Sequence, residues 1–331
     1  MTILVTGGAG YVGSHTVRLL ADRGHKVVVL DTLETGDPHA VVGADLVVGD
    51  TRDTARVASL LGSRQVDTVI HFAAYKAPGD SMDDPGRYFD NNVGGALSLL
   101  RALRDSGVRR VVFSSTCAVY GNPDVIPVDE TQPPNPESPY GESKYLAERI
   151  LKWFDTCHGV RSVILRYFNA AGASLDGRIG ENWDATTNLV PLAIKATCGY
   201  APPLKVFGTD YPTPDGTAIR DYVHVVDLAF AHAQALDYLA GGGASTVLNL
   251  GTGRGSSVLE VIRSLESASA RVVPWEPASR RPGDPVALWA DNTRAREVLG
   301  WKPRYELDDI VATAWRWHSE HLGRRPPTAV R

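Results

Sequence analysis

The sequence predicts an α/β protein in which a doubly wound parallel sheet precedes a smaller C-terminal α/β unit. In the first half of the chain, short apolar runs alternate with segments of helical periodicity, which is the pattern of repeated β-α-β units. Several runs are continuous stretches of Val, Ile and Leu, as expected for strands that helices cover on both faces. A glycine-rich turn directly follows the first run. Together these observations are typical of a Rossmann-type fold.

Each element of the first half has its own signal in the sequence. Six short apolar runs are predicted as buried strands: Ile3–Thr6, Lys26–Leu30, Asp45–Val48, Thr68–His71, Arg110–Ser114 and Ser162–Leu165. Four intervening segments are predicted as helices: Tyr11–Arg23, Thr54–Leu61, Tyr88–Asp105 and Tyr140–Cys157. A glycine follows each of these helices, where a left-handed C-terminal cap favours that residue: Gly24, Gly62, Gly107 and Gly159.

The regular alternation ends near Asn169, and turn-rich stretches follow. Between them the sequence predicts a strand at Thr246–Leu250 and helices at Asp227–Leu239, Val258–Ser267 and Asp308–His321. The length of 331 residues corresponds to about two domains. We therefore expect one domain in residues 1–169 and a second in residues 170–331, with some later segments packing back on the first.

The composition argues against several classes of protein and site. A formal net charge of −4 disfavours a surface that binds nucleic acid. No apolar run reaches the roughly 18 residues of a membrane helix, and the chain begins without a signal-peptide pattern. The three scattered cysteines and nine histidines show no spacing typical of a disulfide framework or a metal site. We expect a cytoplasmic protein that holds no metal ion.

The glycine-rich turn predicts a dinucleotide site. Gly7, Gly10 and Gly13 form a G-x-x-G-x-x-G pattern between the first strand and the first helix. Glycine permits a tight turn and close approach of a pyrophosphate, to which the helix N-terminus offers free amides. Asp31 ends the second strand, where a carboxylate binds the hydroxyls of an adenosine ribose. Residues 32–37 include no Arg or Lys for a 2′-phosphate, so the expected cofactor is NAD rather than NADP.

A second pattern predicts proton-transfer chemistry. Tyr140 and Lys144 are four residues apart and therefore lie on one face of a predicted helix. A nearby ammonium and a cationic nicotinamide favour the phenolate form of a tyrosine, which can then act as a base. Thr116 follows a predicted strand at the sheet edge where ligands bind in such folds. Cys117 is interpreted as a small apolar residue beside this hydroxyl–Tyr–Lys set, not as a nucleophile.

These motifs together resemble the extended short-chain dehydrogenase/reductase superfamily, whose catalytic set is Ser/Thr, Tyr and Lys. Longer stretches resemble the UDP-glucose 4-epimerase family within it: residues 71–77 (HFAAYKA), 90–93 (DNNV), 165–169 (LRYFN) and 207–225 (FGTDYPTPDGTAIRDYVHV). The resemblance extends from residue 1 to about residue 320. It implies that Thr116 orients the reacting hydroxyl and that Tyr140 is the acid and base. Lys144 would lower the pKa of that tyrosine and anchor a cofactor ribose.

The resemblance also implies two sets of binding residues. Contacts with NAD are assigned to Gly7, Gly10, Tyr11, Val12, Gly13, Asp31, Asp50, Phe72, Ala73, Lys76, Asn91, Tyr140, Lys144 and Tyr167. Contacts with a UDP-sugar are assigned to Thr116, Tyr140, Asn169, Asn188, Leu189, Phe207, Arg220, Arg281, Asp284 and Leu288. Among the latter, the two arginines offer forked donors to a diphosphate, and Leu288 is expected to border the hexose.

The function that the resemblance implies is interconversion of UDP-galactose and UDP-glucose. The sugar would be oxidised at C4 by retained NAD, rotate as a 4-keto intermediate and be reduced from the opposite face. A 4,6-dehydratase is disfavoured because Cys117-Ala118 stands where that chemistry is associated with Asp-Glu. A 4-epimerase of UDP-N-acetylhexosamines or UDP-pentoses, and a non-catalytic NAD-binding regulator, stay open. A homodimer through the helices Tyr88–Asp105 and Tyr140–Cys157 is also implied.

Overall fold

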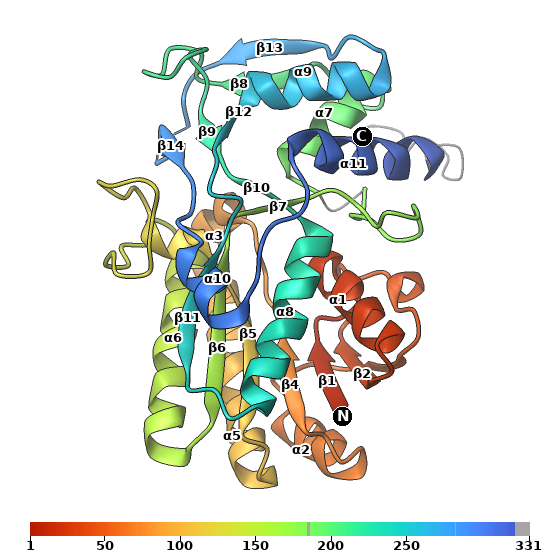
Figure 1. Ribbon diagram of the computed structural model, residues 1–331, viewed down its shortest axis with the longest axis vertical. Coiled ribbons are helices and arrows are strands. Elements are labelled where there is room, and N and C mark those ends of the chain that lie inside the picture. Colours follow the sequence, from red (N-terminus) through yellow and green to blue (C-terminus); the bar gives the residue numbers. More distant parts are fainter. Residues whose placement is uncertain (184–185, 282, 322–331) are drawn as a thin grey trace.

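A seven-stranded sheet forms the centre of the larger unit (Figure 1). The computed structural model describes residues 1–183, 186–281 and 283–321. All neighbouring strands pair in parallel, in the order β11-β6-β5-β4-β1-β2-β3. The strands are β1 (Thr2–Thr6), β2 (Lys26–Asp31), β3 (Asp45–Val48), β4 (Thr68–His71), β5 (Arg110–Thr116), β6 (Arg161–Tyr167) and β11 (Thr246–Leu250). This order contains the 3-2-1-4-5-6 arrangement of the Rossmann fold, so the prediction of a doubly wound parallel sheet is confirmed.

Helices cover both faces of the sheet because successive strand residues point to opposite sides. Ile3 and Val5 of β1 are buried in one apolar core, whereas Leu4 between them is buried in another. The first core includes residues of α1 (Tyr11–Asp22) and α8 (Val225–Ala240). The second core includes residues of α2 (Thr54–Ser63), α5 (Gly95–Ser106) and α6 (Pro139–His158). This double burial explains the continuous apolar runs of the strands.

The segment predicted as one helix over Tyr88–Asp105 is divided, so that prediction is wrong in part. The short helix α4 (Pro85–Tyr88) leads into a π-helical turn, Phe89–Gly94, and α5 begins only at Gly95. Within the π turn, the buried Asn92 side chain binds both the N–H and the C=O of Tyr75, at 2.9 and 3.1 Å. Such wide turns often occur at functional sites, and apolar periodicity does not reveal them.

Three of the four predicted glycine caps are confirmed. Gly24, Gly107 and Gly159 have φ values of 79°, 81° and 66° at the ends of α1, α5 and α6. Gly62 is not a cap, because α2 continues to Ser63 and the left-handed residue beyond it is Gln65, with φ of 51°. Leu61 is buried in the second core, and Gly62 next to it lies inside the last turn of α2.

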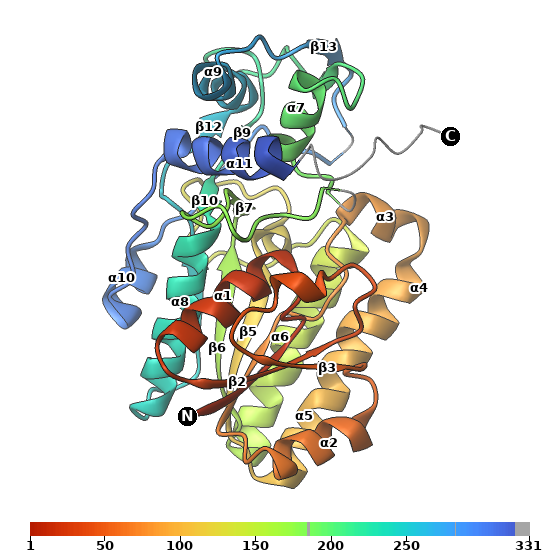
Figure 2. The same cartoon turned by 90° about the vertical axis from the view of Figure 1, so that its right-hand side faces the viewer.

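The smaller unit lies beyond the carboxyl ends of the sheet strands (Figures 1 and 2). Its helices α7 (Leu189–Thr197), α9 (Val258–Ser269) and α11 (Leu307–His321) share a third apolar core. Three small sheets accompany them: β8 (Leu204–Phe207) with β13 (Trp275–Ala278), β9 (Ile219–Arg220) with β12 (Ser256–Ser257) and β14 (Ala287–Leu288), and β7 (Asn169–Ala171) with β10 (Tyr222–His224). The elements of the whole chain not yet named are α3 (Pro78–Asp83), α10 (Thr293–Leu299) and the 3₁₀ turns Pro38–Ala40 and Cys117–Tyr120.

The chain returns from the smaller unit to the larger one. Strand β11 pairs with β6 along its whole length, and α8 packs against α1. Both segments follow residue 169, which agrees with the expectation that later segments pack back on the first domain. The domain boundary itself, near residue 169, stays a prediction.

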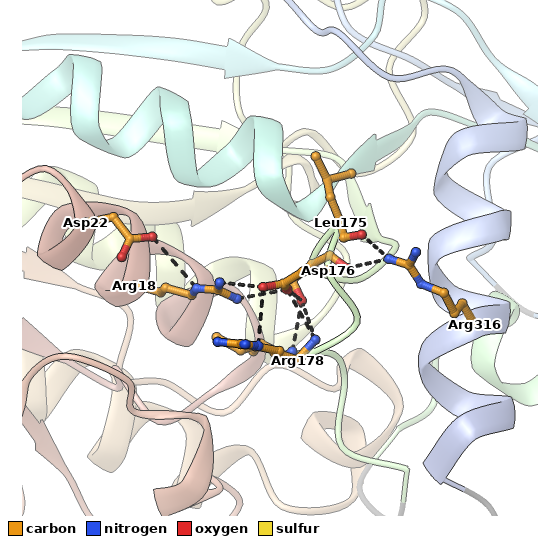
Figure 3. A network of polar contacts seen from close by, with 8 residues as sticks. Arg18, Asp22, Leu175, Asp176, Arg178 and Arg316 are labelled. Atoms are coloured by element: carbon orange, nitrogen blue, oxygen red, sulfur yellow. Dashed lines mark hydrogen bonds and ion pairs between the residues drawn. The ribbon is translucent and has the colours of Figure 1, made fainter.

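A polar network connects α1 to the smaller unit (Figure 3). Asp176, in the loop after β7, accepts hydrogen bonds from both terminal nitrogens of Arg18 at 2.9 and 2.5 Å. Arg316 of α11 donates a hydrogen bond to the carbonyl oxygen of Leu175 in the same loop. Because these groups are partly exposed, each ion pair contributes about 1 kcal/mol or less. The network therefore fixes the path of this loop more than it stabilises the fold.

Candidate active site

The turn between β1 and α1 has the shape that a pyrophosphate requires. Gly7 has a φ of +71°, and a Cβ on it would lie 2.5 Å from the backbone nitrogen of Ala73. A Cβ on Gly13 would lie 2.3 Å from the carbonyl oxygen of Gly7. Glycine is therefore required at both positions. Gly10 is the N-cap of α1, whose first-turn amides have no partner within the helix and suit an anion. These residues fit the pyrophosphate of a dinucleotide.

Asp31 lies beside this turn, at the end of β2. Its Oδ2 accepts a hydrogen bond from the N–H of Ala9 at 3.0 Å, and its Oδ1 accepts one from the N–H of Leu33 at 2.9 Å. The carboxylate thus braces the glycine-rich turn and places a negative charge next to it. Its contact with a ribose stays a prediction, and so does the contact of Tyr11 and Val12 with the cofactor.

Asp50 forms an ion pair with Arg52, with 2.7 Å between Oδ2 and Nη2. Hydrogen bonds from the Arg52 side chain hold the pKa of Asp50 below its ordinary value, so the carboxylate is ionised. Arg52 also contacts Asp90, which lies within the π turn. The predicted adenine contact of Asp50 stays a prediction.

The predicted catalytic residues lie on β5 and α6. Helix α6 begins at Pro139, and the hydroxyl of the N-cap Ser138 accepts a hydrogen bond from the N–H of Gly141 at 3.2 Å. Tyr140 and Lys144 follow on this helix, one turn apart and both buried. Thr116 is the last residue of β5, and its hydroxyl lies close enough to Tyr140 to act on the pKa of the phenol. The strand end and the helix start therefore bring the hydroxyl and the phenol together.

Burial controls the acid–base properties of the two residues on α6. Burial raises the pKa of Tyr140 well above the ordinary value, and the nearby Thr116 hydroxyl offsets this only in part. Burial lowers the pKa of Lys144 to about 7, while the negative charge of Glu148 acts in the opposite direction. The Nζ of Lys144 donates a hydrogen bond to the carbonyl oxygen of Ser114 at 2.9 Å. Formation of a phenolate at Tyr140 therefore needs additional positive charge nearby.

Other predicted cofactor residues lie at the carboxyl edge of the sheet. Phe72 and Ala73 follow β4, and their N–H groups donate hydrogen bonds to the carbonyl oxygen of Thr6 at 2.9 and 3.1 Å. The hydroxyl of Tyr167, at the end of β6, lies 2.5 Å from the Ser114 hydroxyl. Asn91 donates a hydrogen bond to the buried side chain of Asn92 at 3.0 Å. The structure thus places these residues around the glycine-rich turn and Tyr140, although it does not test their contact with NAD.

The residues predicted to bind a UDP-sugar form two pairs on the smaller unit. Arg220 of β9 and Asp284 form an ion pair at 3.6 Å. The guanidinium of Arg281 lies 3.8 Å from the ring centroid of Phe207, at the end of β8. Leu288 of β14 is buried and pairs with Arg220 in the register of the small sheet. These cationic groups and the apolar Leu288 come from three separate segments of the chain.

Two amides flank these pairs. Asn169 donates hydrogen bonds from its backbone and its side chain to the carbonyl oxygen of Asp221, at 2.9 and 3.2 Å. Asn188 stands at the N-cap of α7, directly before Leu189. The charge of Arg220 acts on the thiol of Cys117, which adjoins Thr116. Arg220 therefore lies near the predicted catalytic residue Thr116, whereas binding of a UDP-sugar by this set of residues stays a prediction.

Sequence reasoning missed several buried carboxylates. Asp221 accepts hydrogen bonds from the N–H groups of Thr252, Gly253 and Ala290 at 2.8, 3.2 and 3.1 Å, and so links residues 252–253 to Ala290. Glu148 forms a buried ion pair with Arg166 at 2.5 Å, beneath Lys144. The position of Glu148 one helical turn after Lys144 could have indicated from the sequence that the two side chains lie close together. No local pattern marked Asp221 beyond its place in the stretch of residues 207–225.

Burial raises the pKa of the Cys117 thiol to about 12, which supports its interpretation as a non-nucleophilic neighbour. Among residues 1–183, 186–281 and 283–321, no three His, Cys, Asp or Glu side chains are grouped as metal ligands. Within the same ranges, none of the helices has the length and apolar character needed to cross a membrane.

Comparisons with known proteins agree on one family. The family model described as GDP-mannose 4,6 dehydratase matches residues 4–314. A UDP-glucose 4-epimerase of Rhizobium meliloti is 49% identical over 317 residues, which cover 96% of this chain and 97% of the relative. The crystal structure of UDP-glucose 4-epimerase from Brucella ovis in complex with NAD has a TM-score of 0.93 and 47% identity, covering 95% of this chain and 97% of that one. The Stenotrophomonas maltophila UDP-glucose 4-epimerase with bound NAD and formylated UDP-arabinopyranose has a TM-score of 0.95 and 41% identity, covering 98% and 100%.

Proposed function

The chain belongs to the UDP-glucose 4-epimerase family, and from this we propose that it interconverts UDP-galactose and UDP-glucose with bound NAD. The observation that carries the proposal is the convergence of Thr116, Tyr140 and Lys144 beside the glycine-rich turn. Oxidation and reduction of a sugar hydroxyl need an acid–base group next to a hydride carrier, and this arrangement supplies both positions.

Tyr140 is the acid and base of the reaction. As a phenolate it removes the proton of the sugar 4-hydroxyl, which the Thr116 hydroxyl orients, and it later returns that proton. NAD, when bound, would supply the acceptor and donor of the hydride for C4. Because burial raises the pKa of Tyr140, the phenolate depends on positive charge from Lys144 and from the oxidised cofactor.

Inversion at C4 requires that one end of the substrate stays fixed while the other turns. The smaller unit offers Arg220 and Arg281 to the diphosphate, from two different segments. Rotation of the 4-keto sugar then presents its opposite face to the hydride, and the configuration is inverted without net oxidation. Asp31 favours NAD over NADP, because its carboxylate would repel a 2′-phosphate.

A second substrate class has specific support. The Stenotrophomonas relative is named with a bound formylated UDP-arabinopyranose, which supports a UDP-pentose as an alternative ligand for this chain. A non-catalytic regulator is disfavoured because the tyrosine, the lysine and the threonine are all present.

We also propose a cytoplasmic homodimer. The exposed side of α6, where Trp153 is 64% exposed, suits a helix–helix interface between two copies. The three cysteines are free thiols, which agrees with a reducing compartment.

The proposal is tested by incubating the purified protein with UDP-galactose and measuring UDP-glucose formation without added cofactor. We expect Tyr140→Phe to lower the rate by about 10²–10⁴-fold, because it removes the acid–base oxygen. The variant should still contain NAD, which denaturation and chromatography can quantify. A Tyr140→Phe protein with more than about a tenth of the wild-type rate would exclude this role, and wild-type protein that is inactive on both hexoses would exclude the proposed substrate.

A further inference from the structure

Glu181 is a buried carboxylate that contacts residues of both halves of the site, although none of the assignments above includes it. Its Oε1 accepts a hydrogen bond from Asn188 Nδ2 at 2.7 Å and another from the Thr186 hydroxyl at 2.9 Å. The same oxygen lies 3.4 Å from Nζ of Lys76. Only 6% of the Glu181 residue surface is exposed, whereas 55% of the Lys76 side chain is exposed. One oxygen atom thus connects a residue after β4 with the N-cap of α7.

The backbone of Glu181 is fixed by the smaller unit. Its carbonyl oxygen accepts a hydrogen bond from Nε1 of Trp317 on α11 at 3.1 Å. On the cofactor side, its charge adds to the effect of burial in raising the pKa of Tyr11, the first residue of α1. Lys76 Nζ lies 5.9 Å from the ring centroid of that tyrosine. The carboxylate therefore acts on the start of α1 and is held by α11.

The side chain of Asn188 does not make the usual N-cap bond. An asparagine in this position normally accepts a hydrogen bond from an amide of the first helical turn. Here the N-cap of α7 has no side-chain cap hydrogen bond, and the amide nitrogen of Asn188 donates to Glu181 instead. With Nδ2 bonded to Glu181, Oδ1 is the acceptor that this side chain can offer to an N–H or hydroxyl group of a ligand.

We propose that Glu181 is a positioning residue that orients Asn188 for the uridine nucleotide and couples it to Lys76 on the cofactor side. This inference rests on the proposed function. An unpaired carboxylate beside a diphosphate would oppose its binding, so the ammonium of Lys76 is needed to compensate the charge. The Asn188 side chain needs an acceptor oxygen at position 181, and the nucleotide needs the negative charge of Glu181 to be compensated by Lys76. Different mutations can remove the oxygen and the charge separately.

The test measures the Kd of UDP for the NAD-containing protein by isothermal titration calorimetry. We expect Glu181→Ala to weaken UDP binding about tenfold, because Asn188 loses its acceptor and can turn to cap α7. Glu181→Gln keeps an acceptor oxygen without the charge and should bind within about threefold of wild type. Asp227→Ala is the matched control, since it removes another buried carboxylate that accepts hydrogen bonds from the N–H groups of Arg304 and Tyr305.

Lys76→Met, made in two backgrounds, tests the coupling even where Glu181→Ala does not fold. It should weaken UDP binding about fivefold in the wild-type background and leave it unchanged in Glu181→Gln, which has no charge to compensate. An equal loss in both backgrounds would show that Lys76 acts on the nucleotide directly and would overturn the coupling. UDP binding by Glu181→Ala within about twofold of wild type would overturn the positioning role.

Failure of this inference can be distinguished from failure of the proposed function. If wild-type protein interconverts the two hexoses and binds UDP, but the Glu181 variants match the Asp227→Ala control, only the inference is wrong. If wild-type protein neither interconverts them nor binds UDP, the proposed function is wrong and the inference is wrong with it.

Discussion

Tyr140 and Lys144 are both buried on one face of α6, and burial moves their pKa values in opposite directions. The phenol is made a weaker acid and the ammonium a stronger one, so the pair is set for proton transfer only when a further cation is present. Thr116 adds a hydroxyl that favours the phenolate. The individual residues were identifiable from the sequence, whereas their ionisation depends on the surrounding core.

Leu288 tests substrate selection at the scale of one residue. Its side chain is buried beside Arg220, in the position that the family resemblance assigns to the border of the hexose. We expect wild-type protein to prefer UDP-glucose and UDP-galactose and to act weakly on UDP-N-acetylglucosamine. Leu288→Tyr should reduce activity on the N-acetylated sugar by about tenfold or more, because the larger ring occupies space that an acetamido group needs.

The measurement compares kcat/KM for both substrate pairs in wild type and Leu288→Tyr. Leu288→Met, which conserves volume, is the matched control and should change neither value by more than about threefold. If Leu288→Tyr handled the N-acetylated pair as well as wild type, Leu288 would be a core residue that does not limit the sugar pocket.

Helix α6 works as one element, because Tyr140, Lys144 and Glu148 recur at intervals of four residues along it. Glu148 anchors the helix to the sheet through Arg166 of β6 and through the Ser115 hydroxyl of β5. Arg166 also donates a hydrogen bond to the Tyr120 hydroxyl at 2.9 Å. The same carboxylate that positions the helix therefore supplies the charge that limits the fall in the pKa of Lys144.

This arrangement predicts a shift in pH dependence for Glu148→Gln. Removal of the negative charge lowers the pKa of Lys144 below about 7, so the ammonium that supports the phenolate is lost at a lower pH. The alkaline limb of the kcat/KM profile should move toward acid, with the largest loss of rate above neutrality. The thermal midpoint should also fall, because Arg166 loses its partner.

Glu148→Asp serves as the control, because it retains the charge. Its alkaline limb should stay near that of wild type even if shortening the side chain lowers the thermal midpoint. Identical limbs in wild type and Glu148→Gln would contradict a role for Glu148 in the ionisation of Lys144.

At the scale of the whole molecule, five buried histidines make the fold sensitive to acid. Burial lowers the pKa of His15 and His232 to about 4. It lowers the pKa of His71, His224 and His318 to about 3. These residues lie in both units, in helices α1, α8 and α11 and in strands β4 and β10. Their neutral forms are therefore part of the folded state throughout the molecule.

The sign of the pH dependence follows from these shifts. Below the ordinary histidine pKa of about 6.5, the unfolded chain takes up protons that the folded chain does not accept until about pH 4 for two of these histidines and about pH 3 for the other three. Stability is therefore present above pH 6.5 and is lost progressively as the pH falls toward 3. Each histidine contributes a loss of at most about 1.4 kcal/mol per pH unit.

Urea unfolding at pH 8, 7, 6 and 5.5 measures this dependence. His318 lies on α11, whereas the predicted catalytic residues lie on β5 and α6. We expect His318→Leu to reduce the slope of unfolding free energy against pH by up to about 1.4 kcal/mol per pH unit. The exposed His39 provides the control, and His39→Gln should leave the slope unchanged. If the slope of unfolding free energy against pH in His318→Leu equalled that of wild type and of His39→Gln, His318 would be excluded as a source of acid sensitivity.

Local patterns in the sequence were sufficient for much of the fold and for the outline of the site. All six predicted strands of the first half occur, and β3 (Asp45–Val48) and β4 (Thr68–His71) begin and end where predicted. The glycine-rich turn and the pairing of Tyr140 with Lys144 were also predictable, because each depends on residues close together in the chain. Apolar periodicity and fixed spacing carry that information directly.

Only the tertiary structure decided the features that depend on distant segments. The pairing of β11 with β6, the π turn at Phe89–Gly94 and the contacts of Glu181 with Lys76 and Asn188 have no local signal. The pKa of Lys144 likewise follows from the amount of protein that surrounds it. The physical reason is that burial and polar pairing are set by elements that meet after folding, whereas periodicity and turn chemistry are properties of short stretches of chain.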